Sequence, residues 1–147
     1  MKNSIEFIDL QSVQGPYRLR LSHSQPKSTT QPGEYLTVEL TGPHLAASSS
    51  RVYLYDPAPF IQFFEEMAEQ WRGWNGVKHW HSVERDFDFK CSSDGLGHIT
   101  IEVTLCSGPY PEDWTVSAMV SLEAGQLNSI ATQIRNFIQS SFRRIPL

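Results

Sequence analysis

The clearest helical pattern runs over residues 57–72, where apolar side chains recur every three to four positions. This spacing gathers them on one stripe of a helix, which then packs on a core. Asp56 is suited to cap the N-terminus, because its carboxylate can accept from unpaired backbone N–H groups, and Pro57 needs no donor there. Gly73 is suited to end the helix in a left-handed conformation. The predicted stripe comprises Phe60, Phe64, Met67, Ala68 and Trp71, widened by Ile61 and Phe63.

The same spacing predicts a second helix over residues 126–142. Arg143 and Arg144 follow its end, where positive charge suits the helix dipole. Its apolar stripe comprises Leu127, Ile130, Ala131, Ile134, Phe137 and Ile138.

Between the two helices, apolar and polar residues alternate, which is typical of antiparallel strands with one covered face. Three strands are predicted there, over 86–91, 98–105 and 114–122, and turn-forming residues join them into a meander. In these strands Phe87, Phe89, Cys91, the aliphatic positions 99–105 and Trp114 point inward.

The first third of the chain is less regular but still strand-like. Its candidate strands cover residues 5–10, 17–22, 35–40 and 52–55. Residues 22–34 contain no aliphatic or aromatic side chain and are predicted to form a long exposed loop. The order is then ββββαβββα, a single α+β domain over residues 1–147, in which two helices pack on one face of a mainly antiparallel sheet.

Composition narrows the class of protein. The chain has 147 residues, 39% hydrophobic and 19% charged, which excludes a disordered or low-complexity protein. Its formal net charge of −4 has the wrong sign for a general nucleic-acid binder, so no nucleic acid is expected as a partner. No apolar run approaches the roughly 20 residues that span a bilayer, so no membrane segment is expected.

Two features indicate a cytoplasmic protein. The first ten residues lack the apolar core and cleavage site of a signal peptide. Cys91 and Cys106 fall on opposite sheet faces, so no disulfide is expected, and free thiols suit a reducing compartment.

Two short segments resemble a known family. They are Trp71-Arg72-Gly73-Trp74-Asn75-Gly76 and Asp94-Gly95-Leu96-Gly97-His98, accompanied by Trp80 and Asp113-Trp114. The chain resembles, over residues 56–140, a bacterial domain-of-unknown-function family with W-x-G-W and D-x-x-G-H-like motifs. The resemblance implies a bacterial cytoplasmic setting and supports the order of elements, and it implies no activity.

Catalytic and metal-binding patterns are weak. Asp94 and His98 flank a glycine turn, and a hairpin loop explains that pattern without an acid–base role. His79 and His81 share a strand face, a spacing that some metal sites use, but the predicted pairing places His98 too far along the sheet to join them. We therefore assign no catalytic residue, metal ligand or cofactor.

The outward face of the meander carries an acidic stripe of Glu84, Asp86, Asp88 and Glu102. The predicted register places Glu102 directly across from Asp86 or Asp88, and like charges directly opposite are unfavourable on a sheet. Either Arg18 and Arg20 neutralise the stripe from a strand of the same sheet, or the stripe awaits a basic partner.

The four tryptophans are predicted to fall into two groups. Trp71 and Trp114 occupy inward positions and are predicted to lie in the core. Trp74 and Trp80 either close the edge of the core or form an anchor at an interface.

Three functional hypotheses follow. The first is a non-enzymatic protein-binding module, in its most concrete form an immunity-like protein whose acidic stripe blocks a basic toxin or nuclease. The second is a small-ligand-binding or enzymatic domain with a pocket near segment 74–98, bordered by Trp74, His79, His81 and His98. The third is a homodimer that pairs through edge strands or sheet faces.

Overall fold

The computed structural model describes residues 6–24 and 34–142. Four strands come first: β1 (Phe7–Gln11), β2 (Arg18–His23), β3 (Glu34–Gly42) and β4 (Leu45–Leu54). After α1 (Ala58–Glu69) come β5 (Lys78–His81), β6 (Phe87–Ser93), β7 (His98–Cys106) and β8 (Thr115–Glu123). A short 3₁₀ turn, η1 (Ala124–Gln126), leads into α2 (Leu127–Phe142). The α+β class and the predicted order are confirmed, and β5 adds a short strand before the three predicted ones.

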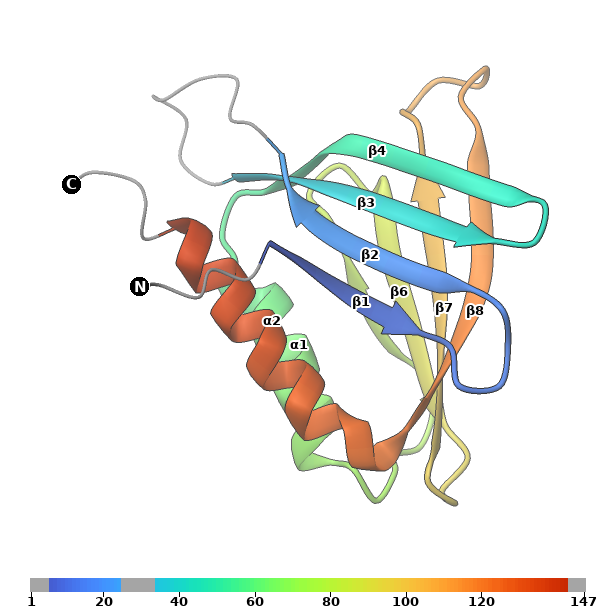
Figure 1. The fold of residues 1–147 in the computed structure, drawn as a ribbon, viewed down its shortest axis with the longest axis vertical. Helices are drawn as coiled ribbons and strands as arrows, with labels where there is room; N and C mark the ends of the chain where they lie inside the picture. Colours follow the sequence, from blue (N-terminus) through green and yellow to red (C-terminus); the bar gives the residue numbers. More distant parts are fainter. Residues whose placement is uncertain (1–5, 25–33, 143–147) are drawn as a thin grey trace.

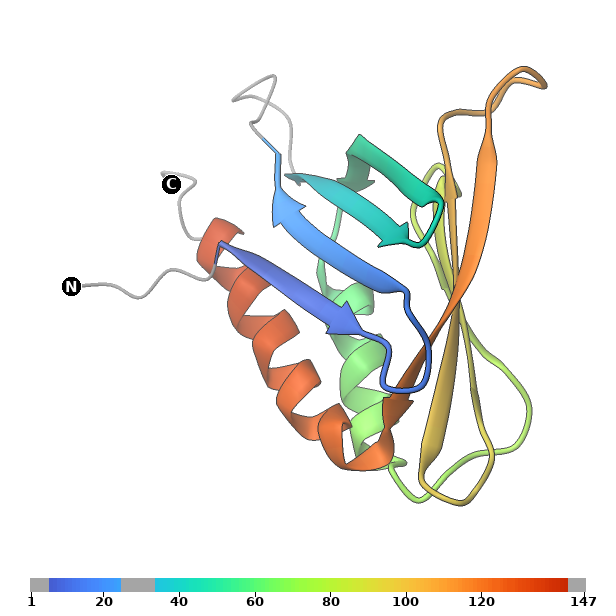
Figure 2. The same cartoon turned by 45° about the vertical axis from the view of Figure 1, so that its right-hand side comes forward.

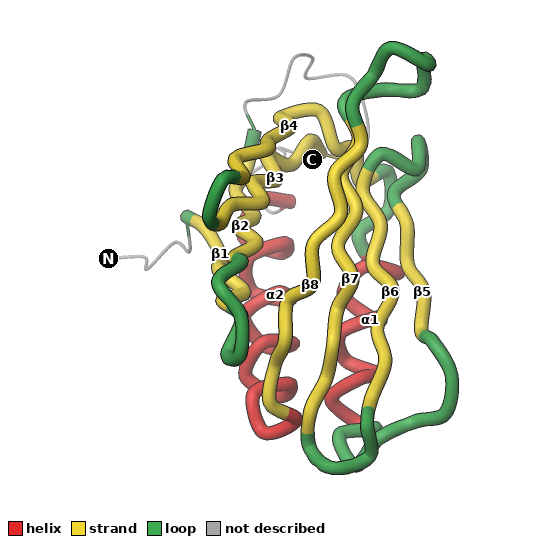
Figure 3. Tube along the Cα trace, turned by 90° about the vertical axis from the view of Figure 1, so that its right-hand side faces the viewer, coloured by secondary structure: helices red, strands yellow, loops and turns green. Residues whose placement is uncertain are grey.

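The strands form two antiparallel sheets of four strands each, rather than a single sheet. The first sheet has the order β1-β2-β3-β4 and the second β5-β6-β7-β8, so each is an up-and-down meander. The second sheet runs along one side of the molecule, and the first sheet and both helices lie on the other (Figures 1 and 2). In Figure 3 the second sheet faces the viewer and the helices lie behind it. Within the described ranges, neither helix combines the length and apolar character needed to cross a membrane.

The two sheets are joined where the end of β1 meets β8. The backbone N–H of Val13 donates to the carbonyl oxygen of Ser121 at 2.8 Å. The Ser12 hydroxyl oxygen accepts from the backbone N–H groups of Ser121 and Gly15 and lies 2.8 Å from the Ser121 hydroxyl oxygen. Ser12 is buried, and these bonds satisfy its side chain.

One cluster of buried apolar side chains joins both sheets and both helices, and its centre is aromatic. The ring of Phe89 in β6 lies with its centroid 6.2 Å from that of Phe60 and 5.7 Å from that of Phe64, both in α1. Trp80 and Phe87 approach the same ring to 5.6 and 4.8 Å. The predicted stripe of α2 is confirmed, because all six of its residues are buried.

The core prediction is wrong for two tryptophans. Trp71 is 52% exposed and Trp114 is 40% exposed. α1 ends at Glu69, three residues before the predicted end, so Trp71 lies in the turn after the helix and outside its periodic stripe. Trp114 precedes the first residue of β8 and lies beyond the part of that strand that is buried. Trp74 and Trp80 are partly buried and pack against the core.

The ends of several elements also differ from the prediction. The N-cap of α1 is Pro57, one residue later than predicted, although Asp56 still accepts from the backbone N–H of Ala58 at 3.0 Å. β4 starts at Leu45, seven residues before the predicted strand. The prediction missed this first half because its residues do not alternate in polarity. The predicted loop 22–34 is too wide, since its first two residues belong to β2 and its last begins β3. Residues 25–33, like Arg143 and Arg144, lie outside the described residues.

The two cysteines lie on opposite faces of the second sheet, as predicted. Cys91 is fully buried on the inner face, whereas Cys106 is partly exposed, and both are free. Burial raises the pKa of the Cys91 thiol to about 12.

We expect one thiol to react with Ellman's reagent in the native chain at pH 8. Cys106 is accessible, whereas the high pKa of Cys91 removes the thiolate that attacks the reagent. The variant Cys106→Ser should show no fast reaction until guanidinium unfolds it. Fast labelling of native Cys106→Ser would contradict this assignment.

We expect Phe89→Ala to lower the free energy of unfolding by about 3–5 kcal/mol, because it leaves a cavity at the aromatic centre of the core. Urea unfolding followed by circular dichroism measures the change. Tyr110→Ala is the matched control, since Tyr110 is 74% exposed and its loss should cost less than about 0.5 kcal/mol. Equal losses in the two variants would show that the cluster does not hold the fold.

Candidate functional site

The four acidic residues predicted as a stripe do not form an opposed row. Glu84 lies in the turn between β5 and β6 and is exposed. Glu102 of β7 pairs with Lys90 of β6, and Asp88 pairs with Thr104. The predicted register is therefore wrong, because β6 continues through Ser93 and the turn starts later than expected.

Three of these acids have partners within the second sheet or beside it. Asp88 Oδ2 lies 2.6 Å from His79 Nε2, and Asp86 Oδ1 accepts from the hydroxyl of buried Ser82 at 2.6 Å. Lys90 stands opposite Glu102. Asp86 and Asp88 thus each have a hydrogen-bonding partner, and the nearest residue across the strand from Glu102 is a cation.

Neutralisation by Arg18 and Arg20, the alternative left open by the sequence, is wrong. Both arginines belong to β2 of the first sheet. The Arg20 guanidinium donates to Asp9 of β1 at 2.7 and 2.9 Å, and these hydrogen bonds lower the pKa of Asp9.

The four residues predicted to border a pocket do not converge. His79 and His81 lie on β5 opposite Lys90 and Asp88, whereas His98 begins β7 and pairs with Glu123 of β8. Trp74 packs against the core and donates its indole N–H to the carbonyl oxygen of Cys91 at 3.3 Å. Among the described residues, no three His, Cys, Asp or Glu side chains are placed to hold a metal ion.

Asp94 and His98 form a compact turn, as the hairpin interpretation predicts. One Asp94 oxygen accepts from the backbone N–H groups of Leu96 and His98 at 2.7 and 3.1 Å, and the other lies 2.6 Å from His98 Nδ1. The backbone hydrogen bond from Leu96, followed by the contact with His98, lowers the pKa of Asp94. The same contact raises the pKa of His98.

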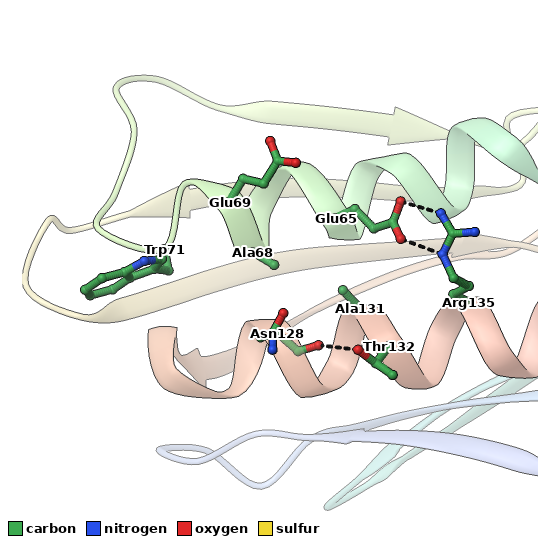
Figure 4. Close-up of a pocket in the computed structure, with 8 residues that line it drawn as sticks. All are labelled: Glu65, Ala68, Glu69, Trp71, Asn128, Ala131, Thr132 and Arg135. Atoms are coloured by element: carbon green, nitrogen blue, oxygen red, sulfur yellow. Dashed lines mark hydrogen bonds and ion pairs between the residues drawn. The ribbon is translucent and has the colours of Figure 1, made fainter.

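A groove lies between α1 and α2 on the outer side of the helix pair, with a volume of about 560 Å³. Figure 4 shows Trp71 at one end of this groove and an ion pair between Glu65 and Arg135 at the other. The Arg135 guanidinium donates to both Glu65 oxygens, at 2.6 and 2.8 Å, and these bonds lower the pKa of Glu65. The groove is lined by Glu65, Ala68, Glu69, Trp71, Asn128, Ala131, Thr132 and Arg135.

A second hollow, of about 500 Å³, adjoins the groove, because Trp71 lines both. Leu96 also lines it and is 81% exposed, the most exposed large apolar side chain among the described residues. Small residues and backbone atoms form much of the remaining wall of this hollow. The hollow is lined by Trp71, Arg72, Gly95, Leu96, Gly97, Glu123, Ala124 and Gly125.

The second hollow exists because segments 71–76 and 94–98 meet in space. Gly73 has a φ of +123°, and a Cβ placed on it would lie 2.9 Å from Ser93 Oγ and 3.2 Å from the Cα of Gly95. Only glycine combines that backbone conformation with so close an approach. The contact sets the turn after α1 against the β6–β7 turn and leaves Trp71 and Leu96 at the surface.

We name the lining of the groove and the adjoining hollow the Trp71 surface. It offers an exposed indole, an exposed leucine, a floor of small side chains and a charged rim, which suits the binding of side chains from another molecule. The sequence prediction missed it by assigning Trp71 to the core stripe. One signal was present, because Leu96 is an apolar residue within a glycine turn.

We expect the pKa of His98 to lie above the ordinary histidine value of about 6.5 and to fall toward it in Asp94→Asn. Stability from the raised pKa of His98 is present below about pH 6.5 and is lost as the pH rises through the folded-state value. Stability from the lowered pKa of Asp94 is present above about pH 4 and is lost as the pH falls through the folded-state value. The pair therefore stabilises most between about pH 4 and 6.5.

Ring signals in an NMR pH titration measure this pKa, and His81 serves as the control, because its ring contacts the backbone of Ser82 rather than a carboxylate. A His98 pKa that does not move in Asp94→Asn would contradict the contact.

Comparison with known proteins places the chain in a family. A search of curated proteins finds no match. The model of a family described as a family of unknown function (DUF6228) matches residues 10–141, which is most of the chain. The chain therefore belongs to this family of unknown function.

Proposed function

We propose that the chain is a non-enzymatic protein-binding module that contacts its partner through the Trp71 surface. The observation that carries this proposal is the position of Trp71, a half-exposed indole shared by two adjoining hollows. Tryptophan is enriched among the residues that dominate binding energy at protein interfaces, where it sits near the centre of a patch.

The surroundings of Trp71 support the proposal. Ala68 and buried Ala131 give the groove a shallow apolar floor, and Leu96 extends the apolar area on the other side of the indole. Charged side chains lie at the edge, with Glu65 and Arg135 already paired. An apolar centre with a polar rim is the usual anatomy of an interface between proteins.

The proposal keeps the basic partner predicted from the sequence. If this chain is an immunity-like protein, that partner is a toxin or nuclease. The contact moves from the acidic stripe to the Trp71 surface, because Asp86, Asp88 and Glu102 each face a local partner. Glu84 and Glu102 serve as the comparison surface in the experiment.

We expect Trp71→Ala to weaken binding of the partner at least about 30-fold, the effect of losing a residue that dominates an interface. Gly125→Phe should weaken binding similarly by filling the second hollow. A Cβ on Gly125 meets no atom within 4 Å, and its φ is not positive, so the fold should tolerate the substitution. Affinity capture from lysate of the source cells identifies the partner, and calorimetry with purified proteins measures each Kd.

Trp114→Ala is the matched control, since it also removes a partly exposed tryptophan but lies outside the Trp71 surface. Circular dichroism checks that all variants remain folded. A partner that binds wild type and Trp71→Ala equally would overturn the proposed surface. Loss of binding only in Glu84→Lys and Glu102→Lys would assign the contact to the sheet face instead.

A further inference from the structure

We propose that the Trp71 surface binds an arginine or lysine side chain of the partner, stacked on Trp71 in the place that Arg72 holds in the free chain. This inference rests on the proposed function and names the chemistry that the surface recognises.

The free chain already places a cation on this indole. The guanidinium carbon of Arg72 lies 5.1 Å from the centroid of the Trp71 ring. A cation within about 6 Å of a ring centroid is attracted by the negative face of the ring, and tryptophan gives the strongest such attraction. The geometry shows that a guanidinium fits against Trp71.

Arg72 is held there weakly. Its side chain is exposed, and it forms no ion pair with any described residue. By contrast, Arg20 and Arg135 are each fixed by two hydrogen bonds to a carboxylate. A cation from another molecule can therefore take the place of Arg72 without breaking an ion pair.

The charges around the indole favour a cation over an anion. Glu65 and Arg135 neutralise each other, which leaves Glu69 and Glu123 against Arg72 among the residues that line the Trp71 surface. An arriving arginine or lysine balances this excess of carboxylate, and displaced Arg72 stays near the same acids. An arriving carboxylate would meet Arg72 together with two like charges.

The apolar parts of the surface define the rest of the ligand. Leu96, Ala124 and the backbone of the glycine turn line the hollow on the Arg72 side of Trp71. A segment that carries an aliphatic side chain beside its cation can fill this hollow while the cation stacks on the indole. The recognised chemistry is thus a basic residue next to an apolar one.

The test is a titration of the full chain with fluorescein-labelled Gly-Arg-Leu-Gly-Arg-Leu-Gly, followed by anisotropy at low salt. Two matched peptides carry citrulline or glutamate in place of arginine; citrulline keeps the shape of arginine without its charge. We expect the arginine peptide to bind at least about 10-fold more tightly than either, and Trp71→Ala to remove this preference.

Arg72→Met gives the discriminating result. Removing the internal competitor should tighten binding of the arginine peptide by about 2–5-fold, the size of an exposed cation–π contact, and leave the citrulline peptide unchanged. Arg51→Met is the matched control, because it changes the net charge by the same amount. Arg51 is exposed and lies on β4, away from Arg72 in the sequence. Arg51→Met should tighten binding less than Arg72→Met.

Weaker or unchanged binding of the arginine peptide in Arg72→Met would overturn the inference, as would preference for the glutamate peptide. The two proposals fail in different ways. A partner that depends on Trp71 but tolerates glutamine at its basic residues would leave the protein-binding function standing and remove the cation site. A Trp71-dependent preference for the arginine peptide without a protein partner would do the reverse.

Discussion

The contact between α1 and the inner face of the second sheet governs the rest of the structure. The rings of Phe60 and Phe64 meet Phe89 there, and Trp80 closes the same cluster from β5. Because aromatic side chains bury large areas, this contact holds α1 against the sheet. The helix ends once its buried stripe does, after Met67, and the chain then turns back toward β5. The exposed position of Trp71 follows from that early end.

Burial explains which predictions succeeded. In α2, all six predicted apolar positions are buried, because the helix contacts the core along its length and period 3.6 is then a sufficient guide. In the second sheet, alternation correctly assigns Phe87, Phe89 and Cys91 to the inner face. Alternation, however, does not set which residues face each other across strands. Turn geometry sets that register. Because the turn begins at Asp94 rather than Ser92, the residue opposite Glu102 is Lys90 and not an acid.

The candidate site was hidden from sequence reasoning for a related reason. Trp71 continues the apolar spacing of α1 in the sequence, so only tertiary structure shows that the helix has already ended. The meeting of Gly73 with Gly95 joins segments more than twenty residues apart, and no local pattern predicts a contact of that kind. The division of the strands into two sheets is also a tertiary result, which is why Arg18 and Arg20 lie away from the acids that they were candidates to neutralise.

The acidic sheet face and the Trp71 surface differ in which existing contacts a partner must displace. On the sheet face, Asp88 and Asp86 already hydrogen-bond to His79 and Ser82, so a basic partner that contacts these two acids competes with those bonds. A partly exposed charge pair such as the one that a cation would form with Asp88 contributes little net free energy. At Trp71, a large apolar area faces water in the free chain, and its burial is favourable without the loss of any ion pair. In the proposed complex, the indole would therefore supply most of the binding energy, and the net negative charge of the chain would mainly raise the rate at which a basic partner arrives.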